Sequence, residues 1–162
     1  MKWGMKKTLL GSTVVAALTF PAAALAHSDK IVINKSIDGV RLGMTEGQVK
    51  TVEGMPSEIV GASKPYTEFN YGHADQLEVD FDKVHGKKLV TNVTVEPGYH
   101  AETSKGITFN STKRAVLRAY PAAKFLNNVG QIWIDQEGTY NTSFLLSRSN
   151  RVIQIAVGWN YG

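Results

Sequence analysis

The sequence has 162 residues, a formal net charge of +4 and no cysteine. Without cysteine the chain cannot form a disulfide, use a thiol nucleophile, bind a metal through a thiolate or carry a lipid on a cysteine. The length is sufficient for one domain with a sizeable apolar core, or for two very small ones. Hydrophobic burial must therefore hold the fold together.

The first 26 residues have the layout of a cleaved secretory signal peptide. Three lysines precede a mostly apolar run over residues 9–20, and the small tripeptide Ala-Leu-Ala ends at Ala26. The apolar run is too short for a comfortable membrane span, which takes about 20 residues. We therefore expect residues 1–26 to be removed and residues 27–162 to be exported, with no membrane segment left.

The net charge changes once the signal peptide is set aside. Residues 27–162 contain 15 basic and 14 acidic residues, a net charge of +1. This balance argues against a nucleic-acid partner, which requires a strong basic stripe. The charge is also uneven, with −3 on residues 27–100 and +4 on residues 101–162. The two parts are expected to attract each other or to offer opposite charges to a partner.

One short helix and several strands are expected in the first half. Thr45 is an N-cap candidate, and Gln48 three residues later completes a capping box. Gly54 and Pro56 end this helix after about two turns. Strand-like runs lie on both sides of it, bounded by turn residues. They cover residues 30–34, 65–72, 76–82 and 89–96.

Strict alternation marks the run over residues 76–82. Its odd positions are apolar, and its even positions from Glu78 to Asp82 are acidic. Alternation of this kind predicts an antiparallel sheet that is covered on one side only. In the next run, Leu89 and Val93 are expected to share the apolar face.

A weaker copy of one motif returns 67 residues later. GVRLGMTEGQV at residues 39–49 matches GITFNSTKRAV at residues 106–116, with Thr112 as the second N-cap candidate. Strand-like runs again follow, over residues 131–136, 141–147 and 151–159. The order predicts an α+β fold made as a tandem repeat, residues 27–100 and 101–162. Each repeat is expected to be a short helical segment packed on an antiparallel three- to four-stranded sheet.

LGMTEGQV and FNSTKRAV resemble the helix start of proteins related to β-lactamase inhibitory protein. The first stretch is also similar to the helix start of the small lipoprotein subunit of the outer-membrane β-barrel assembly machinery. In the inhibitor family, two tandem copies of a helical segment plus an antiparallel sheet build one concave molecule. The resemblance covers nearly all of residues 27–162, and it implies a bacterial protein that binds other proteins with an open sheet.

This chain departs from both patterns. The inhibitor has disulfides, and this chain has no cysteine; the assembly lipoprotein has a lipidated cysteine where this sequence has His27. A membrane role of that kind is therefore not expected. The target-binding loop of the inhibitor has no residue-by-residue match, so the resemblance supplies no contact residues, and it leaves open whether a β-lactamase is a target.

Catalytic and metal motifs are not evident. The densest ionisable group is Asp75, Glu78, Asp80, Asp82 and His85. Strand alternation explains its acidic members as the solvated face, and the spacing of a calcium loop is missing. No two histidines have the i, i+4 spacing of a helical zinc motif, and no GxSxG or phosphate-binding glycine loop occurs. We therefore expect no metal, no cofactor and no enzymatic activity.

Aromatic residues gather in or beside the expected strands. Ile132 and Ile134 are expected to face the core, which turns Trp133 outward, although packing of Trp133 under a loop or the other repeat stays open. Exposed aromatic residues on a sheet are typical anchors of protein interfaces. The expected partner-contact residues are Tyr66, Glu78, Asp80, Trp133 and Tyr140.

The sequence thus predicts a secreted, non-enzymatic module that binds a protein partner through an open sheet surface, as an inhibitor or a scaffold. The alternative is a cell-envelope carbohydrate-binding protein or wall hydrolase. A hydrolase requires two carboxyl groups about 5 to 9 Å apart in a cleft, whereas a binding module does not.

Overall fold

The structure of the chain is a computed structural model that describes residues 30–72, 76–136 and 138–159. The predicted signal peptide, residues 1–26, lies outside this part. The described residues form one antiparallel sheet, one small mixed sheet and two short helices, so the predicted α+β class is confirmed. Within these ranges no helix is long and apolar enough to cross a bilayer.

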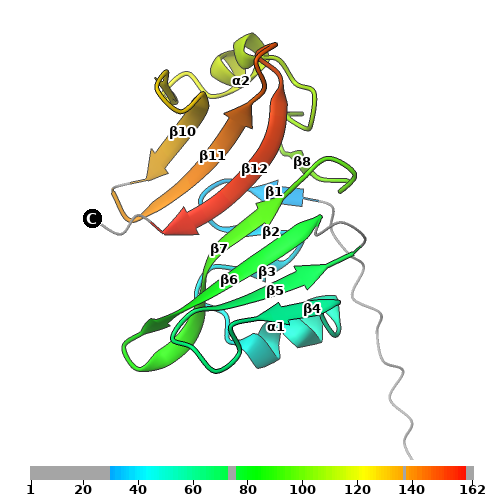
Figure 1. The fold of residues 1–162 in the computed structure, drawn as a ribbon. Coiled ribbons are helices and arrows are strands. Elements are labelled where there is room, and N and C mark those ends of the chain that lie inside the picture. The colour runs from blue at the N-terminus through cyan, green and yellow to red at the C-terminus, as the bar shows by residue number, and fades with distance from the viewer. Residues whose placement is uncertain (1–29, 73–75, 137, 160–162) are drawn as a thin grey trace, which may run out of the picture.

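One large antiparallel sheet dominates the part of the chain that the structure describes (Figure 1). Its eight strands curve across the molecule, and every pair of neighbours is antiparallel. In sheet order the strands are β4 (Glu58–Val60), β5 (Thr67–Tyr71), β6 (Leu77–Val84), β7 (Lys87–Val95), β12 (Val152–Trp159), β11 (Tyr140–Leu146), β10 (Gln131–Gln136) and β9 (Lys124–Leu126).

A second, smaller sheet lies behind the large one in the view of Figure 1. Its strands are two or three residues long, and two of them contact β7. Parallel pairing of the strand Lys30–Val32 with the strand Glu102–Thr103 joins the N-terminal segment to the middle of the chain. In sheet order the strands are β3 (Val40–Arg41), β2 (Ser36–Ile37), β1 (Lys30–Val32) and β8 (Glu102–Thr103).

Both predicted helix starts are confirmed. Helix α1 (Glu46–Glu53) begins after Thr45, whose side chain accepts from the Gln48 amide while the Gln48 side chain accepts from the Thr45 amide. Helix α2 (Lys113–Ala119) begins after Thr112, whose hydroxyl oxygen accepts from the Ala115 amide. Helices this short are not stable alone, and each buries one central valine against a sheet.

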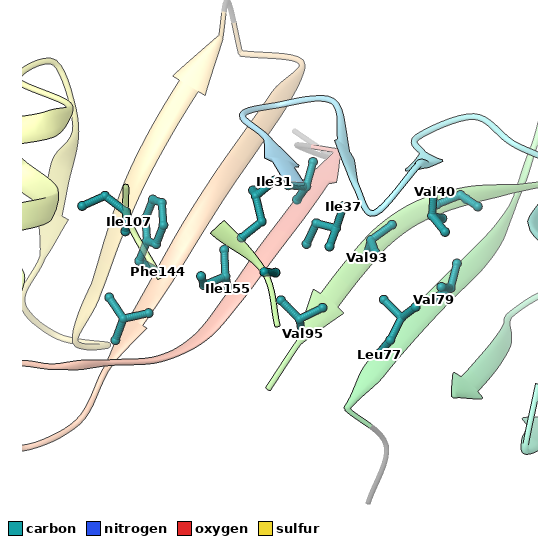
Figure 2. Close-up of a cluster of buried hydrophobic side chains, with 14 of the residues drawn as sticks. Ile31, Ile37, Val40, Leu77, Val79, Val93, Val95, Ile107, Phe144 and Ile155 are labelled. Carbon is teal, nitrogen blue, oxygen red and sulfur yellow. The ribbon is translucent and has the colours of Figure 1, made fainter. Parts of the chain in front are cut away.

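The core fills the space between the two sheets (Figure 2). Ile31, Ile37 and Val40 come from the small sheet, and they meet side chains of the large sheet such as Val93 and Ile155. All five are at most 2% exposed. Burial of this apolar side of the large sheet leaves its other side without a covering layer among the described elements.

The prediction that Leu89 shares the apolar face with Val93 is wrong, because a β-bulge interrupts the pairing of β6 with β7. The register of β6 against β7 shifts after Asp80, so that Asp80 pairs with Asn92 but Phe81 pairs with Val90. Because of the extra residue, Val90 and not Leu89 shares the buried face with Val93. A bulge of this kind re-aims the side chains beside it, and here it lies next to the candidate site.

The two expected repeats share one sheet. A separate three- to four-stranded sheet for each half was expected, but β7 of the first half pairs with β12 of the second over four residue pairs. The order of elements is similar on the two sides of this junction, with α1 leading to β4–β7 and α2 leading to β9–β12. Duplication of one unit stays a prediction.

Candidate binding surface

The uncovered side of the large sheet, here called the open face, carries most of the predicted contact residues. In β6 the core residues Leu77, Val79 and Phe81 alternate with partly exposed Glu78 and Asp80. In β10, Ile132 is fully buried and Trp133 turns the other way, half-buried, as the sequence predicted. The open face therefore receives side chains from both halves of the chain.

A hollow of about 310 Å³ crosses the open face. Its walls come from strands of both halves, with aromatic rings on opposite sides of planar polar groups. Small Gly158 lies in its lining, where a Cβ would approach the Asn92 side-chain oxygen to 2.9 Å. Its lining includes Tyr66, Asp80, Asn92, Trp133, Asn141 and Gly158.

Asp80 is held by hydrogen bonds on both of its carboxylate oxygens. Oδ1 lies 2.8 Å from the Tyr66 hydroxyl, and Oδ2 accepts from Asn92 Nδ2 at 3.0 Å. Asn92 also donates to the Thr94 hydroxyl at 2.9 Å. Two residues further along β6, Asp82 accepts a hydrogen bond from the Thr91 hydroxyl at 2.8 Å. The polar wall of the hollow is therefore ordered by its own contacts.

Tyr66 contacts two carboxylates with one hydroxyl. Its oxygen lies 2.7 Å from Glu68 Oε2 and 2.8 Å from Asp80 Oδ1. A phenol has one proton to donate, so the Tyr66 hydroxyl shares that proton between the two carboxylates. Burial, and then its hydrogen bonds to both carboxylates, raise the pKa of Tyr66 well above its ordinary value.

Glu68, Glu78 and Asp80 form an acidic cluster at one end of the hollow. One oxygen from each lies within 4.8 Å of the others, and all three residues are partly buried. Burial, and then the charges of Glu68 and Asp82, raise the pKa of Asp80, while its bonds from Asn92 and Tyr66 oppose the shift. These three carboxylates are the described residues that could hold a cation.

Trp133 and Tyr140 do not lie together. The Trp133 indole N–H donates to Gln131 Oε1 at 2.8 Å, which holds the ring on the open face. Tyr140 has the parity of the buried residues Thr142 and Phe144, so it projects toward the core side at the sheet end. There its ring packs against Trp159, with centroids 6.3 Å apart.

Four of the five predicted contact residues therefore share the open face, and Tyr140 is the exception. Sequence reasoning missed Glu68, Asn92, Asn141 and Gly158. The alternation of residues 65–72 predicts that Glu68 lies on the same face as Tyr66, and this signal could have identified Glu68. The meeting of Asn92 with Gly158 depends on strand pairing across the two halves, for which the sequence carries no local signal.

A second hollow, of about 760 Å³, lies beside α2. Four cationic side chains line it, and they come from α2 and from the turn before β12: Lys113, Arg114, Arg118 and Arg151. None of the predicted contact residues belongs to it. Its position in the second half agrees with the excess of basic residues there.

No protein-family model matches the sequence, and no curated protein matches it. Among solved structures, the chain is similar to a DUF4309 family protein (YjgB) from Bacillus subtilis subsp. subtilis str. 168, with a TM-score of 0.45 and 11% identity over 76% of this chain and 84% of that one. It is also similar to an extracellular protein containing a SCP domain from Bacillus anthracis str. Ames, with a TM-score of 0.39, 15% identity and coverage of 72% and 43%. Similarities at this level carry no argument about function.

Proposed function

We propose that residues 27–162 form an exported, non-enzymatic binding module, a tandem repeat by origin, that holds a protein partner on its open face. The supporting observation is the hollow in which the half-buried ring of Trp133 and the exposed ring of Tyr66 flank ordered polar groups on a sheet face. Aromatic anchors within a polar rim are typical of protein interfaces. The family resemblance of the two helix starts agrees with this proposal.

The partner is expected to present a basic segment. Glu68, Glu78, Asp80 and Asp82 place four carboxylates along one side of the open face. Opposite charges steer association and make its rate depend on ionic strength. A partner loop that carries a lysine or arginine next to an apolar side chain would fit this surface. Its cation would face the carboxylates, and its apolar side chain would contact Trp133.

A capture experiment with matched variants tests the proposal. Residues 27–162 are immobilised and exposed to the exported proteins of the source organism, alongside Trp133→Ala and Met55→Ala. Met55 is 75% exposed between α1 and β4, away from the hollow, so its variant is the control. We expect one protein to be retained by the unmodified chain and by Met55→Ala but not by Trp133→Ala.

The captured protein is then purified and titrated against the same three chains. Loss of an interface aromatic anchor weakens binding by 2 kcal/mol or more, about thirtyfold or more. Binding should also weaken as the salt concentration rises. Equal affinity of all three chains for the purified protein would rule out the open face as the interface.

A glycan is the second candidate ligand, because one observation favours it. Planar polar side chains and an aromatic ring line the same hollow, and a volume of about 310 Å³ is in the range of small-molecule sites. Co-sedimentation with purified cell wall tests this alternative. Retention of the chain on the wall and its loss with Trp133→Ala, without capture of any protein, would favour the glycan.

Hydrolysis of such a glycan is less well supported than binding. Glycosidases place their two carboxyl groups on opposite sides of the scissile bond. The carboxylates that line the hollow, Asp80 and Asp82, are two residues apart on one strand and share one wall. Glu68 is close to Asp80, but the Tyr66 hydroxyl occupies the space between them. Release of soluble sugar from wall material would contradict the proposal of a non-enzymatic protein.

A further inference from the structure

The hollow beside α2 has a lining of a single charge. Helix α2 lies at the opposite end of the molecule from α1 (Figure 1), and the hollow beside it has a volume of about 760 Å³. Its cationic residues are Lys113, Arg114, Arg118 and Arg151, and the other described residues that line it are neutral. Four positive charges therefore surround one small volume whose walls supply no counter-charge.

These four cations have no carboxylate partner among the described residues, since none of them forms an ion pair there. The described acidic residues of the second half lie elsewhere, Glu102 on β8 and Asp135 on β10 near Lys124. Arg114 and Arg118 are also four positions apart on α2, a spacing at which like charges destabilise a helix. The arrangement is therefore costly in the free chain, and an anion in the hollow would remove that cost.

Main-chain contacts fix the walls of the hollow. The Lys113 amide donates to the Asn150 carbonyl oxygen at 2.9 Å, and Thr112 pairs with Arg151 in an isolated antiparallel bridge. The Arg151 guanidinium donates through Nη1 to the Asn110 carbonyl oxygen at 2.8 Å. Helix α2 and the turn before β12 are thus held together before a ligand arrives, which lowers the ordering cost of binding.

Side chains, and not the amides at the start of α2, form the site. The Lys113 amide is bonded to Asn150, and the Ala115 amide donates to the Thr112 hydroxyl oxygen. The ammonium group of Lys113 lies 3.0 Å from the centre of the Phe125 ring, a cation–π contact that restrains it. The exposed guanidinium groups, in contrast, keep most of their N–H donors available to a ligand.

The chemistry of the cations indicates phosphate. Three of the four are arginines, whose planar guanidinium groups match phosphate oxygens with paired N–H donors. Arg114 and Arg118 are about 6 Å apart along the helix axis, so they can contact two anionic groups. A volume of about 760 Å³ likewise exceeds the needs of a single phosphate. We propose that this hollow binds a ligand that carries at least two phosphate groups on one molecule.

A nucleic acid fits this hollow poorly. No aromatic residue is among the described residues that line it, so unpaired bases have no platform on which to stack. A small phosphorylated compound and a polymer of phosphodiester-linked units both present the required groups, and the experiment distinguishes these two sources. The site shares no residue with the hollow on the open face, and it does not rest on the proposed protein partner.

Pyrophosphate is the first probe, titrated calorimetrically into residues 27–162 at about 50 mM sodium chloride, where charge screening is modest. We expect one saturable site with at least about tenfold higher affinity for pyrophosphate than for inorganic phosphate, because two linked groups bind together. Citrate carries a similar charge near neutral pH on carboxylates instead of phosphates. Its binding to the chain should be clearly weaker than that of pyrophosphate.

Matched arginine variants make the assignment specific. Arg114→Gln and Arg118→Gln should each weaken pyrophosphate binding by about threefold or more. Both should unfold at or above the temperature of the unmodified chain, because they relieve like-charge repulsion on α2. Arg41→Gln is the control, since Arg41 is an exposed arginine on β3 and its replacement changes the net charge equally.

A glycerol phosphate polymer is the second probe, and it identifies the source of the phosphate groups. A polymer should bind at least about tenfold more tightly than pyrophosphate, with an affinity that falls steeply as salt rises. This result, if Arg118→Gln weakens it and Arg41→Gln does not, indicates a phosphodiester polymer. Tighter binding of pyrophosphate than of the polymer indicates a small phosphorylated ligand, and the site is supported in both cases.

Three results would overturn the inference. The first is the absence of saturable pyrophosphate binding up to about 10 mM, which corresponds to negligible affinity. The second is equal affinity for pyrophosphate and citrate, and the third is an equal response of Arg118→Gln and Arg41→Gln. Either of these would show general attraction of anions by a basic surface. Failure of the capture experiment above leaves all of these measurements unaffected.

Discussion

The Tyr66 hydroxyl lies 2.8 Å from Asp80 Oδ1, although Asp80 is 14 positions further along the chain. The same hydroxyl also reaches Glu68, so one proton is shared among three oxygen-bearing groups. This contact ties the aromatic side of the hollow to its acidic side. The ring and the hydroxyl of Tyr66 therefore have separate roles, since the ring lines the hollow and the hydroxyl contacts the carboxylates.

Replacement of Tyr66 by Phe removes the hydroxyl and keeps the ring. Two close carboxylates then lose their common donor, so the unfolding free energy should fall by about 1 kcal/mol in denaturant titrations. The Tyr66→Phe, Asp80→Asn double-mutant cycle should show coupling of similar size. A coupling energy near zero would mean that the contact does not stabilise the fold.

Gly158→Ala should destabilise the chain by about 1–2 kcal/mol through overpacking. The new Cβ would lie 2.9 Å from Asn92 Oδ1 and 3.6 Å from the Thr91 carbonyl oxygen. Asn92 cannot yield freely, because its amide is bonded to Asp80 and Thr94. Partner binding should weaken together with stability.

Gly47→Ala is the matched control for this substitution. Gly47 is inside α1, and a Cβ there would meet nothing within 4 Å. Alanine should therefore stabilise the chain by at most about 0.5–1 kcal/mol, the gain in a helix interior, because Gly47 lies in the first turn of α1. If both variants shifted the urea midpoint in the same direction, the account of Gly158 by close approach would be wrong.

Neighbours on opposite faces of β10 should respond differently to truncation. Ile132→Ala empties a fully buried position and should cost about 2–5 kcal/mol. Trp133→Ala removes a half-buried ring from the open face, and its cost should be closer to 1 kcal/mol. Urea unfolding of the two variants measures this difference. Equal losses would identify Trp133 as a core residue and remove it from the candidate interface.

Tyr71 should make the fold sensitive to alkali. Burial, and then the charge of Glu53, raise the pKa of Tyr71 to about 12. An unfolded tyrosine ionises near pH 10, so the stabilisation is complete below pH 10 and is lost as the pH rises toward 12. The loss amounts to at most about 3 kcal/mol. Below pH 9, Tyr71→Phe should be slightly less stable than the unmodified chain, because it loses the hydrogen bond from the hydroxyl to the Gly54 carbonyl oxygen, and near pH 11.5 it should be the more stable of the two in denaturant titrations.

Local features of this fold could be predicted from the sequence, because neighbouring residues alone determine them. The caps at Thr45 and Thr112 are contacts over three residues, and the outward side of Trp133 follows from the parity of a single strand. The same alternation predicts the side of Tyr140 correctly. Phe144 is four residues away on the same strand and faces the core, so Tyr140 projects to the core side as well. Its assignment to the open face considered its aromatic character and not its register.

Features that depend on strand order could not be predicted in this way. The bulge at Thr91, the pairing of Glu68 with Asp80 and the meeting of Asn92 with Gly158 are set by which strands lie side by side. A one-residue change of register would exchange the two faces of a strand. From the sequence alone, the acidic residues of β6 therefore have the pattern of an ordinary solvated face. Only the pairing of β5 with β6 shows that Glu68 and Asn70 lie beside them.

The junction between β7 and β12 gives the hollow a particular property. Asn92 and Gly158 face each other across this junction, with Tyr66 contributed by the first half and Trp133 by the second. Neither half alone contains all of the lining of this hollow, so a ligand bound there would hold the two halves together and favour their association by its own binding energy. Two fragments divided near residue 100 would thus form a complementation pair, and their reassembly would report on the presence of the ligand.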